Sequence, residues 1–181
     1  MARVTLLTDE ELPKSSEDLI EKMRSGRRGK LLNIYRMLFN SPDLAKTWYG
    51  HMNSVRWDTK LSGRLRELII IRVGYLLDAA YMLHQHIPHL ALLDGVSSQE
   101  CEELRNWTSA KSFSKEERSV LDYVDAITKN RAVDDKIFNT AAQYFNDQEM
   151  VEITVLVGSY NMHGLVMDAL KIDLEDHSEK I

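Results

Sequence analysis

Two stretches of this chain, residues 62–78 and 147–170, contain no turn signal and carry apolar residues on nearly every side. The β-branched runs inside them, 69–71 and 153–157, could locally form buried strands. Length favours helix, because each stretch exceeds about 15 residues and strands are usually much shorter. Helices that are apolar on nearly all sides must be buried on most faces. The sequence therefore predicts an all-α fold built around two buried helices.

Helix-breaking residues are sparse, since the chain has only three prolines and eight glycines. Three start signals place a capping oxygen three residues before an acid. They are Ser97 with Glu100, Ser114 with Glu117, and the looser variant Asn146 with Glu149. Periodicity between the signals predicts helices at residues 15–25, 29–39, 42–56, 62–78, 80–93, 98–107, 115–130, 135–145 and 147–170.

The composition excludes several classes of partner. A net charge of -5 argues against binding to nucleic acid or to an anionic membrane surface, so we expect a small-molecule substrate or a protein partner. The single cysteine, Cys101, allows no intrachain disulfide and favours a reducing, cytoplasmic compartment. The first ten residues lack a signal-peptide apolar region, and Arg72 interrupts the apolar run 68–77, so no membrane segment is expected.

The chain divides by composition into two parts. Residues 1–57 are less apolar and more charged than the rest, which is typical of a helical arm. Residues 58–181 contain both buried helices and form the expected core of what is a single domain overall.

Two motifs carry a family resemblance. Residues 61–73, followed by Tyr81 and His86, form one, and residues 157–162 form the other. Together they resemble the carboxymuconolactone decarboxylase and alkyl hydroperoxidase D (AhpD)-like superfamily over about residues 57–175. The resemblance implies a bundle of packed antiparallel helices, here with an N-terminal helical arm, that assembles as a homo-oligomer of three or a multiple of three subunits.

The resemblance also shows which chemistry is missing. The peroxidase branch of the superfamily uses a Cys-x-x-Cys pair, and Ala79 and Met82 stand at those positions. Together with His86 they follow an i, i+3, i+7 spacing and share one helix face. A thioether cannot form the nucleophilic thiolate, and Cys101 lies outside the motif. The decarboxylase branch often has a Glu at the position of Met82, so that pattern is incomplete too. The lost polar groups suggest a roomier, more apolar pocket.

A proton relay is the chemistry that remains. Glu67 and His86 match the acid and the imidazole of the family's relay, and Glu67 lies inside an apolar run, where burial would raise its pKa. Tyr81 and His163 are further candidate catalytic residues. Glu67 could instead pair with Arg64, Arg66 or Arg72. His86 could be a hydrogen-bonded core histidine, and Tyr81 could be a packing residue.

The substrate is expected to contact Trp57, Ala79, Met82 and Tyr160. Tyr160 and His163 share a helix face at i, i+3. Of the histidines at 84, 86 and 89, only the last two have a spacing suited to one helical metal site, and no acid accompanies them, so no metal is predicted. No glycine-rich phosphate loop or dinucleotide motif is present, and no cofactor is expected.

Two functions follow as hypotheses. The first is a cofactor-independent lyase or isomerase that acts by proton transfer on a small cyclic or unsaturated carboxylic acid, ketone or lactone. The second is a non-catalytic binding or assembly protein that keeps the fold without the chemistry. Glu67 and His86 paired in a dry core would favour the second hypothesis.

Overall fold

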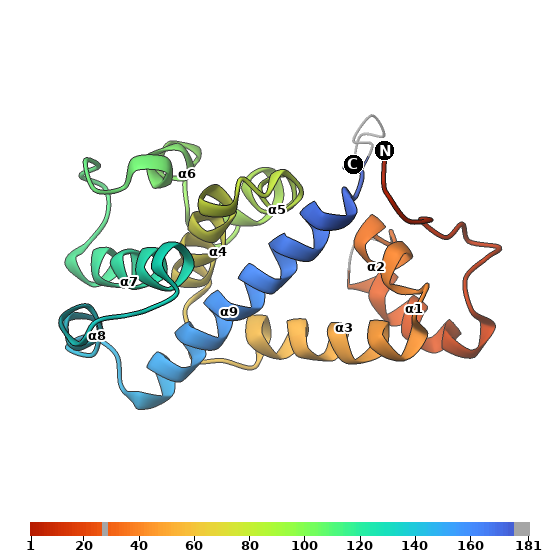
Figure 1. Ribbon diagram of the computed structural model, residues 1–181, viewed down its shortest axis with the longest axis horizontal. Helices are drawn as coiled ribbons and strands as arrows, with labels where there is room; N and C mark the ends of the chain where they lie inside the picture. Colours follow the sequence, from red (N-terminus) through yellow and green to blue (C-terminus); the bar gives the residue numbers. More distant parts are fainter. Residues whose placement is uncertain (27–28, 176–181) are drawn as a thin grey trace. The chain divides into compact units, whose positions relative to one another are not determined.

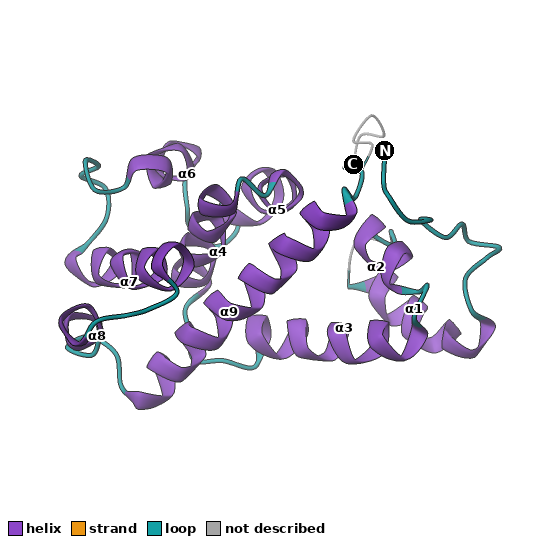
Figure 2. Cartoon of the chain, in the orientation of Figure 1, coloured by secondary structure: helices purple, strands orange, loops and turns teal. Residues whose placement is uncertain are grey.

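The computed structural model describes residues 1–26 and 29–175, and every regular element in that part of the chain is helical (Figure 1, Figure 2). The all-α prediction is confirmed, including for the two β-branched runs. The α-helices are α1 (Glu17–Ser25), α2 (Asn33–Leu38), α3 (Pro42–Trp57), α4 (Gly63–Leu77), α5 (Ala80–His86), α6 (Ser98–Glu103), α7 (Lys115–Asp125), α8 (Asp135–Ala141) and α9 (Asp147–Leu170). No helix among the described residues is both long and apolar enough to cross a membrane.

Several predicted helices are shorter than expected, and two of them change to a π-helical winding. The predicted helix 80–93 ends as α5 at His86 and continues as a π-helical turn, Ile87–Ala91. Pro88 has no N–H to donate, so the regular ladder of hydrogen bonds cannot pass through it. Helix α7 likewise continues as a π-helical turn, Ala126–Asn130, which stops at Arg131 in the left-handed conformation.

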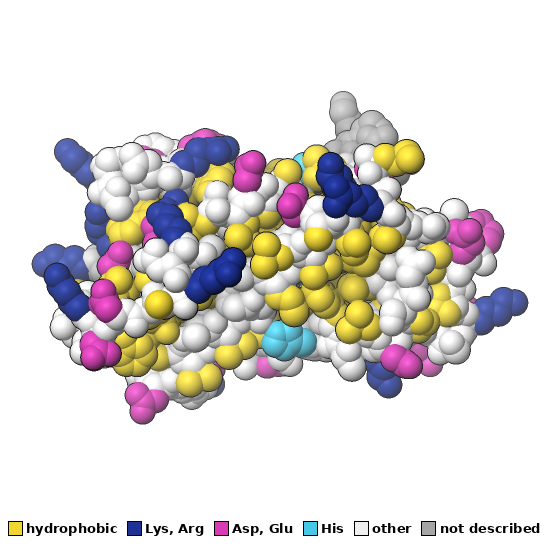
Figure 3. Space-filling model, in the orientation of Figure 1, with side chains coloured by type: hydrophobic (Ala, Val, Ile, Leu, Met, Phe, Trp, Pro, Cys, Tyr) yellow, Lys and Arg dark blue, Asp and Glu magenta, His cyan; other side chains and the backbone are white. Residues whose placement is uncertain are grey.

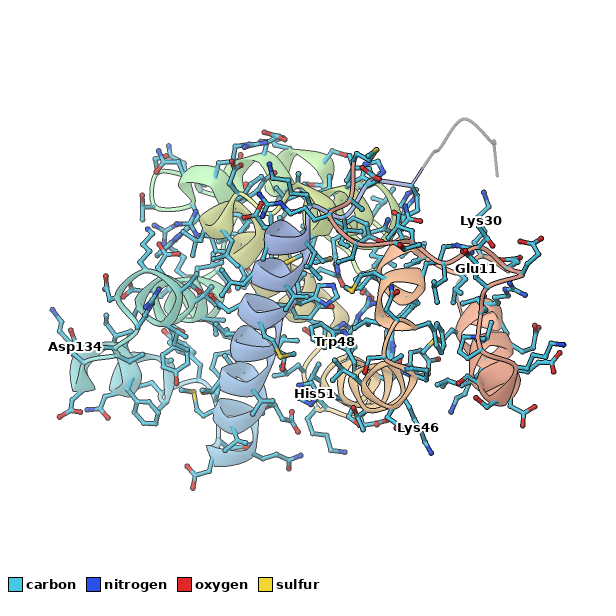
Figure 4. All side chains as sticks on the ribbon, turned by 45° about the vertical axis from the view of Figure 1, so that its right-hand side comes forward. Glu11, Lys30, Lys46, Trp48, His51 and Asp134 are labelled. Carbon is cyan, nitrogen blue, oxygen red and sulfur yellow. The ribbon has the colours of Figure 1, made fainter. Side chains whose placement is uncertain are left out.

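The predicted helix starts are confirmed as reciprocal caps. The Ser97 hydroxyl accepts from the Glu100 backbone N–H at 3.2 Å, and the Glu100 carboxylate accepts from the Ser97 N–H at 2.9 Å. Ser114 with Glu117 and Asn146 with Glu149 make the same exchange. Asp134, labelled in Figure 4, caps α8 by accepting from the Ile137 N–H at 2.9 Å.

One arginine joins three helix starts. Arg64, in the first turn of α4, donates to the Glu100 carboxylate at 2.6 Å and to the Glu117 carboxylate at 2.7 Å. These two acids belong to the caps of α6 and α7. Glu100 and Glu117 therefore cap the N-termini of α6 and α7 and also attach these two helices to the start of α4.

The chain folds as two compact units. The terminal unit contains residues 1–53 and 167–181, and thus most of the predicted arm together with the last turn of α9. Its two chain segments are joined by a hydrogen bond from the Arg3 N–H to the Leu170 carbonyl at 2.8 Å. Its buried side chains include Met23, Ile34 and Phe39.

The core unit contains residues 54–166 and is organised around α4. Every residue of α4 from Leu65 to Gly74 is buried, and α5 and α7 pack against the helix. A hydrophobic cluster that includes Leu68, Ile71 and Leu104 lies on one side. Polar side chains on a helix this deeply buried need specific partners, and these partners define the site.

Candidate active site

A tight reversal between α4 and α5 places the two relay candidates opposite each other. Asp78 ends α4 in the left-handed conformation at φ 53°, which a short polar side chain tolerates better than most. Gly74 allows α5 to approach closely, because a Cβ atom there would stand only 2.8 Å from Leu83 Cδ2. His86, at the end of α5, is thereby brought back alongside Glu67.

Glu67 and His86 are in direct contact. Glu67 Oε2 lies 2.6 Å from His86 Nδ1, although the residues are 19 positions apart in the sequence. The carboxyl group is 0% exposed and the imidazole 6% exposed. A contact of this length between a carboxylate and a ring nitrogen is a strong, charge-assisted hydrogen bond that orients the ring.

The other carboxylate oxygen faces two arginines. Arg56 Nη2 lies 3.5 Å and Arg66 Nε 4.0 Å from Glu67 Oε1. Both guanidinium groups also stack on the Trp57 ring, with Cζ 4.5 and 4.6 Å from its centroid. Pairing with Arg66 was one of the sequence alternatives, whereas Arg56 was missed, because it belongs to the preceding helix and no spacing connects it with Glu67.

The other two arginines considered as partners of Glu67 are engaged elsewhere. Arg64 binds the two capping acids described above. Arg72 forms a bidentate ion pair with Asp125, in which Nε and Nη2 donate to the two carboxylate oxygens at 2.6 and 2.7 Å.

The electrostatic environment of Glu67 is opposite to the one expected. Burial raises the pKa of the Glu67 carboxyl, but the neighbouring His86, Arg56 and Arg66 outweigh it and bring the pKa below its ordinary value. The prediction of a raised pKa was therefore wrong, because it considered burial without the cations that the fold supplies. An acid with a lowered pKa is a poor proton acceptor near neutral pH, so His86 is the better candidate for that role.

Helix α9 adds two rings to the site. The Tyr160 ring meets the His86 ring edge-on, with centroids 5.5 Å apart, and the His163 ring lies 5.6 Å from Tyr160. Tyr160 and His163 thus share a face as expected. Asn161 turns away and donates to the Thr128 hydroxyl at 3.0 Å.

Ala79 and Met82, which stand where the peroxidase branch has its cysteines, are tightly packed rather than next to a roomy pocket. Ala79 and Met82 are 5% and 1% exposed. A Cβ atom on Gly164 of α9 would stand 3.0 Å from Met82 Sδ and 3.4 Å from Ala79 Cβ. The close approach of α9 therefore fills the space in which a larger pocket was expected, and Met82 acts there as a packing residue.

The remaining predicted residues lie at different depths. Tyr81 is buried on α5, and its catalytic role stays a prediction. Trp57 is 51% exposed, and the two arginines stacked on its ring connect it to the site. In the part of the chain that the structure describes, no three His, Cys, Asp or Glu side chains are grouped so that they could hold a metal ion.

Cys101 occupies a different environment from the relay. It is buried in the hydrophobic cluster beside Leu104, and burial raises the pKa of its thiol to about 11. A thiol with a raised pKa forms little thiolate at neutral pH, so we expect this cysteine to react slowly.

The sequence pattern of the carboxymuconolactone decarboxylase family matches residues 42–126, a segment that includes Glu67 and His86. No curated protein matches the chain. A protein of unknown function from Agrobacterium tumefaciens, a candidate antioxidant defence protein AhpD, is 26% identical, with 77% of this chain and 96% of that one covered at a TM-score of 0.72.

Two solved structures share the fold over nearly the whole chain. A peroxidase-related protein from Silicibacter sp. TM1040 is 20% identical, with 96% of this chain and 92% of that one covered and a TM-score of 0.84. The debrominase Bmp8, in a cysteine-to-alanine variant bound to 2,3,4-tribromopyrrole, is 20% identical, with 97% and 94% covered and a TM-score of 0.80.

Proposed function

Since the family match and the shared fold make this chain a member of the carboxymuconolactone decarboxylase and AhpD-like superfamily, we propose that it is an enzyme that moves protons without a cofactor. The reaction class is that of a lyase or isomerase. The proposed substrate is a small cyclic or unsaturated carboxylic acid, ketone or lactone. The observation that carries the proposal is the 2.6 Å contact between Glu67 and His86.

The chemistry follows from that contact. A carboxylate on one ring nitrogen stabilises the imidazolium that forms when the other nitrogen accepts a proton. In the proposed reaction His86 removes a proton next to a carbonyl and returns it at another carbon, or protonates the carbanion left by decarboxylation. Tyr160, Tyr81 and His163 are the candidates that would donate to the developing enolate.

Thiol chemistry is a poor alternative for this chain. Its structural relatives include a peroxidase-related protein, but Ala79 and Met82 occupy the positions of the nucleophilic pair. The only cysteine, Cys101, has a raised pKa and lies in the hydrophobic cluster. Proton transfer uses the groups that are present.

Turnover of a substrate panel tests the proposal. The panel would contain cyclic keto acids, unsaturated lactones and, because Bmp8 binds a brominated pyrrole, halogenated aromatic heterocycles. Exchange of substrate C–H hydrogen for solvent deuterium, followed by NMR, detects proton transfer even without net product. We expect exchange with the wild-type protein and none with His86→Asn. Equal exchange by the two proteins would contradict the proposal.

A non-catalytic binding protein is the second candidate, and one observation favours it. Glu67 and His86 are almost inaccessible to solvent and pair with each other, as a structural ion pair would. The same panel separates the two candidates. Compounds that raise the melting temperature but show no exchange or turnover would support a binding protein, whereas exchange that depends on His86 would support the enzyme.

A further inference from the structure

Two buried arginines surround the oxygen of Glu67 that His86 does not use. The side chains of Arg56 and Arg66 are only 5% and 7% exposed, and both approach Glu67 Oε1. Removing guanidinium groups from water is costly, so such groups are retained in a protein interior when charges there compensate them. The proposed proton transfer by itself assigns no part to either side chain.

Arg66 is held beside Glu67 by two further hydrogen bonds. Arg66 Nη1 donates to the Arg56 carbonyl and Nη2 to the Asp94 carboxylate, each at 2.9 Å. This leaves Arg66 Nε directed at Glu67. Both guanidinium planes are further held against Trp57, a contact that is favourable between a cation and an aromatic ring.

The arginines act on Glu67 as charges rather than as hydrogen-bond donors. Glu67 Oε1 has no hydrogen-bond partner in the described chain, and neither Arg56 Nη2 nor Arg66 Nε has one. At 3.5 and 4.0 Å the attraction between opposite charges is still strong in a buried setting. The two oxygens of Glu67 therefore have different roles, one facing cations and one bonded to His86 Nδ1.

We infer that Arg56 and Arg66 are positioning residues that keep Glu67 ionised and fix the tautomer of His86. An ionised carboxylate can only accept, so His86 Nδ1 must carry the proton of their shared hydrogen bond. The neutral imidazole then has its lone pair on Nε2. In the proposed reaction, on which this inference rests for its catalytic meaning, His86 Nε2 exchanges the proton and Glu67 does not.

The charges around the pair are consistent with this assignment. Two positive charges, on Arg56 at the end of α3 and Arg66 on α4, lie near two negative ones. The negative charges are those of Glu67 on α4 and Asp94 after the π-helical turn. The cluster therefore has no net charge when His86 is neutral. Helix α9 contributes Tyr160 and, behind it, His163, and α6 contributes the protonated Cys101. Loss of either arginine would leave an uncompensated negative charge, which Glu67 could relieve by taking up a proton.

NMR titration of the whole protein tests the inference without any substrate. In the wild-type protein, labelled with ¹³C-Glu and ¹⁵N-His, we expect the Glu67 carboxyl to stay ionised down to below its ordinary pKa and neutral His86 to carry its proton on Nδ1. In Arg56→Gln and in Arg66→Gln the Glu67 midpoint should rise by about 1–3 pH units. Arg56→Lys keeps the positive charge, so its Glu67 midpoint should stay close to the wild-type value.

Arg72→Gln is the matched control. It removes another buried guanidinium from α4, but one that pairs with Asp125, so the Glu67 midpoint should not move. The inference is overturned if Arg56→Gln and Arg66→Gln leave the midpoint at the wild-type value, or if wild-type His86 is protonated on Nε2. Should the glutamine variants fail to fold, the wild-type tautomer and Arg56→Lys still decide. A protein with no enzymatic activity could pass this test, so its outcome is separate from that of the proposed function.

Discussion

Glu67 on α4 and His86 on α5 share a hydrogen bond of 2.6 Å in a place that solvent hardly reaches. The bond joins the two residues into one unit, so neither is expected to function normally without the other. Substitutions at the two positions should therefore have strongly non-additive effects.

The first prediction concerns this unit. On an active member of the substrate panel, Glu67→Gln and His86→Asn should each lower the rate by about 10²- to 10⁴-fold, the usual range for general acid-base catalysis. The double variant should be little worse than the worse single one, because both changes disable the same proton transfer. Steady-state kinetics, with circular dichroism to verify folding, would measure this. Folded single variants that retain the wild-type rate would disprove the catalytic role of the pair.

Two substitutions nearby serve as comparisons. Met82→Leu preserves the volume of a packing residue and should leave the rate nearly unchanged. His163→Val distinguishes two roles for the second imidazole. A loss comparable to that of His86→Asn would make His163 a catalytic group, whereas a full rate would make it a packing partner of Tyr160.

The second prediction is that the protein has no thiol-dependent peroxidase activity. No cysteine stands at position 79 or 82, and the raised pKa of Cys101, about 11, keeps its thiol protonated at pH 7. A coupled assay with alkyl hydroperoxides and a thiol donor should show no turnover, and alkylation of Cys101 in the folded protein should be slow. Peroxide turnover that persists in Cys101→Ser would mean that another group carries out the reduction.

The third prediction is a loss of stability in acid. The hydrogen bond from Arg64 holds the pKa of Glu100 at about 2, and the pKa values of Glu67 and Asp125 are also lowered. Carboxylates with lowered pKa values stabilise the folded state above the ordinary pKa, and this stabilisation is lost as the pH falls through the lowered value. Urea unfolding should therefore show a falling free energy of unfolding from about pH 4.5 toward pH 2.

The contribution of Glu100 can be isolated with one variant. Arg64→Gln removes the donor to Glu100 and Glu117, so the protein should be less stable at pH 7 and its stability should depend less on pH below about 4.5. An unchanged pH dependence in this variant would mean that other carboxylates determine the acid transition.

The fourth prediction is a homo-oligomer of three or a multiple of three subunits. Helix α9 leaves a row of exposed apolar side chains at Val151, Val155, Met162 and Leu165, whose 4, 7 and 3 spacing keeps them on one face. Figure 3 shows hydrophobic side chains at the surface where Figure 1 draws α9. Exposed apolar rows of this kind are typical of interaction surfaces, so we expect this face of α9 to be covered in the assembly. Light scattering at micromolar concentration should give a mass well above the 20.9 kDa of one chain.

Charge placed in the row should weaken the assembly. Val155→Glu with Leu165→Glu is expected to shift the mass toward that of a single chain, since two carboxylates would have to be buried in the contact. Leu92→Glu changes an exposed apolar residue outside α9 and is the control. A wild-type mass near 21 kDa would rule the oligomer out.

Features that depend on neighbours in the sequence were predictable. A capping box needs a serine and a glutamate three residues apart, so Ser97 with Glu100 was visible without coordinates. The absence of thiols at Ala79 and Met82, and the choice of Glu67 and His86, came from the motif that these residues form. The length of the apolar stretches was enough to decide between helix and strand.

The tertiary structure alone decided how these residues behave. It brought Glu67 and His86 together across two helices, added Arg56 from a third, and closed the space beside Met82 with Gly164. The pKa of Glu67 shows the reason most clearly, because burial and nearby cations shift it in opposite directions. Burial of an acid can be expected from its apolar neighbours in the sequence, but the Coulomb energy depends on distances between side chains that only the packing of helices sets.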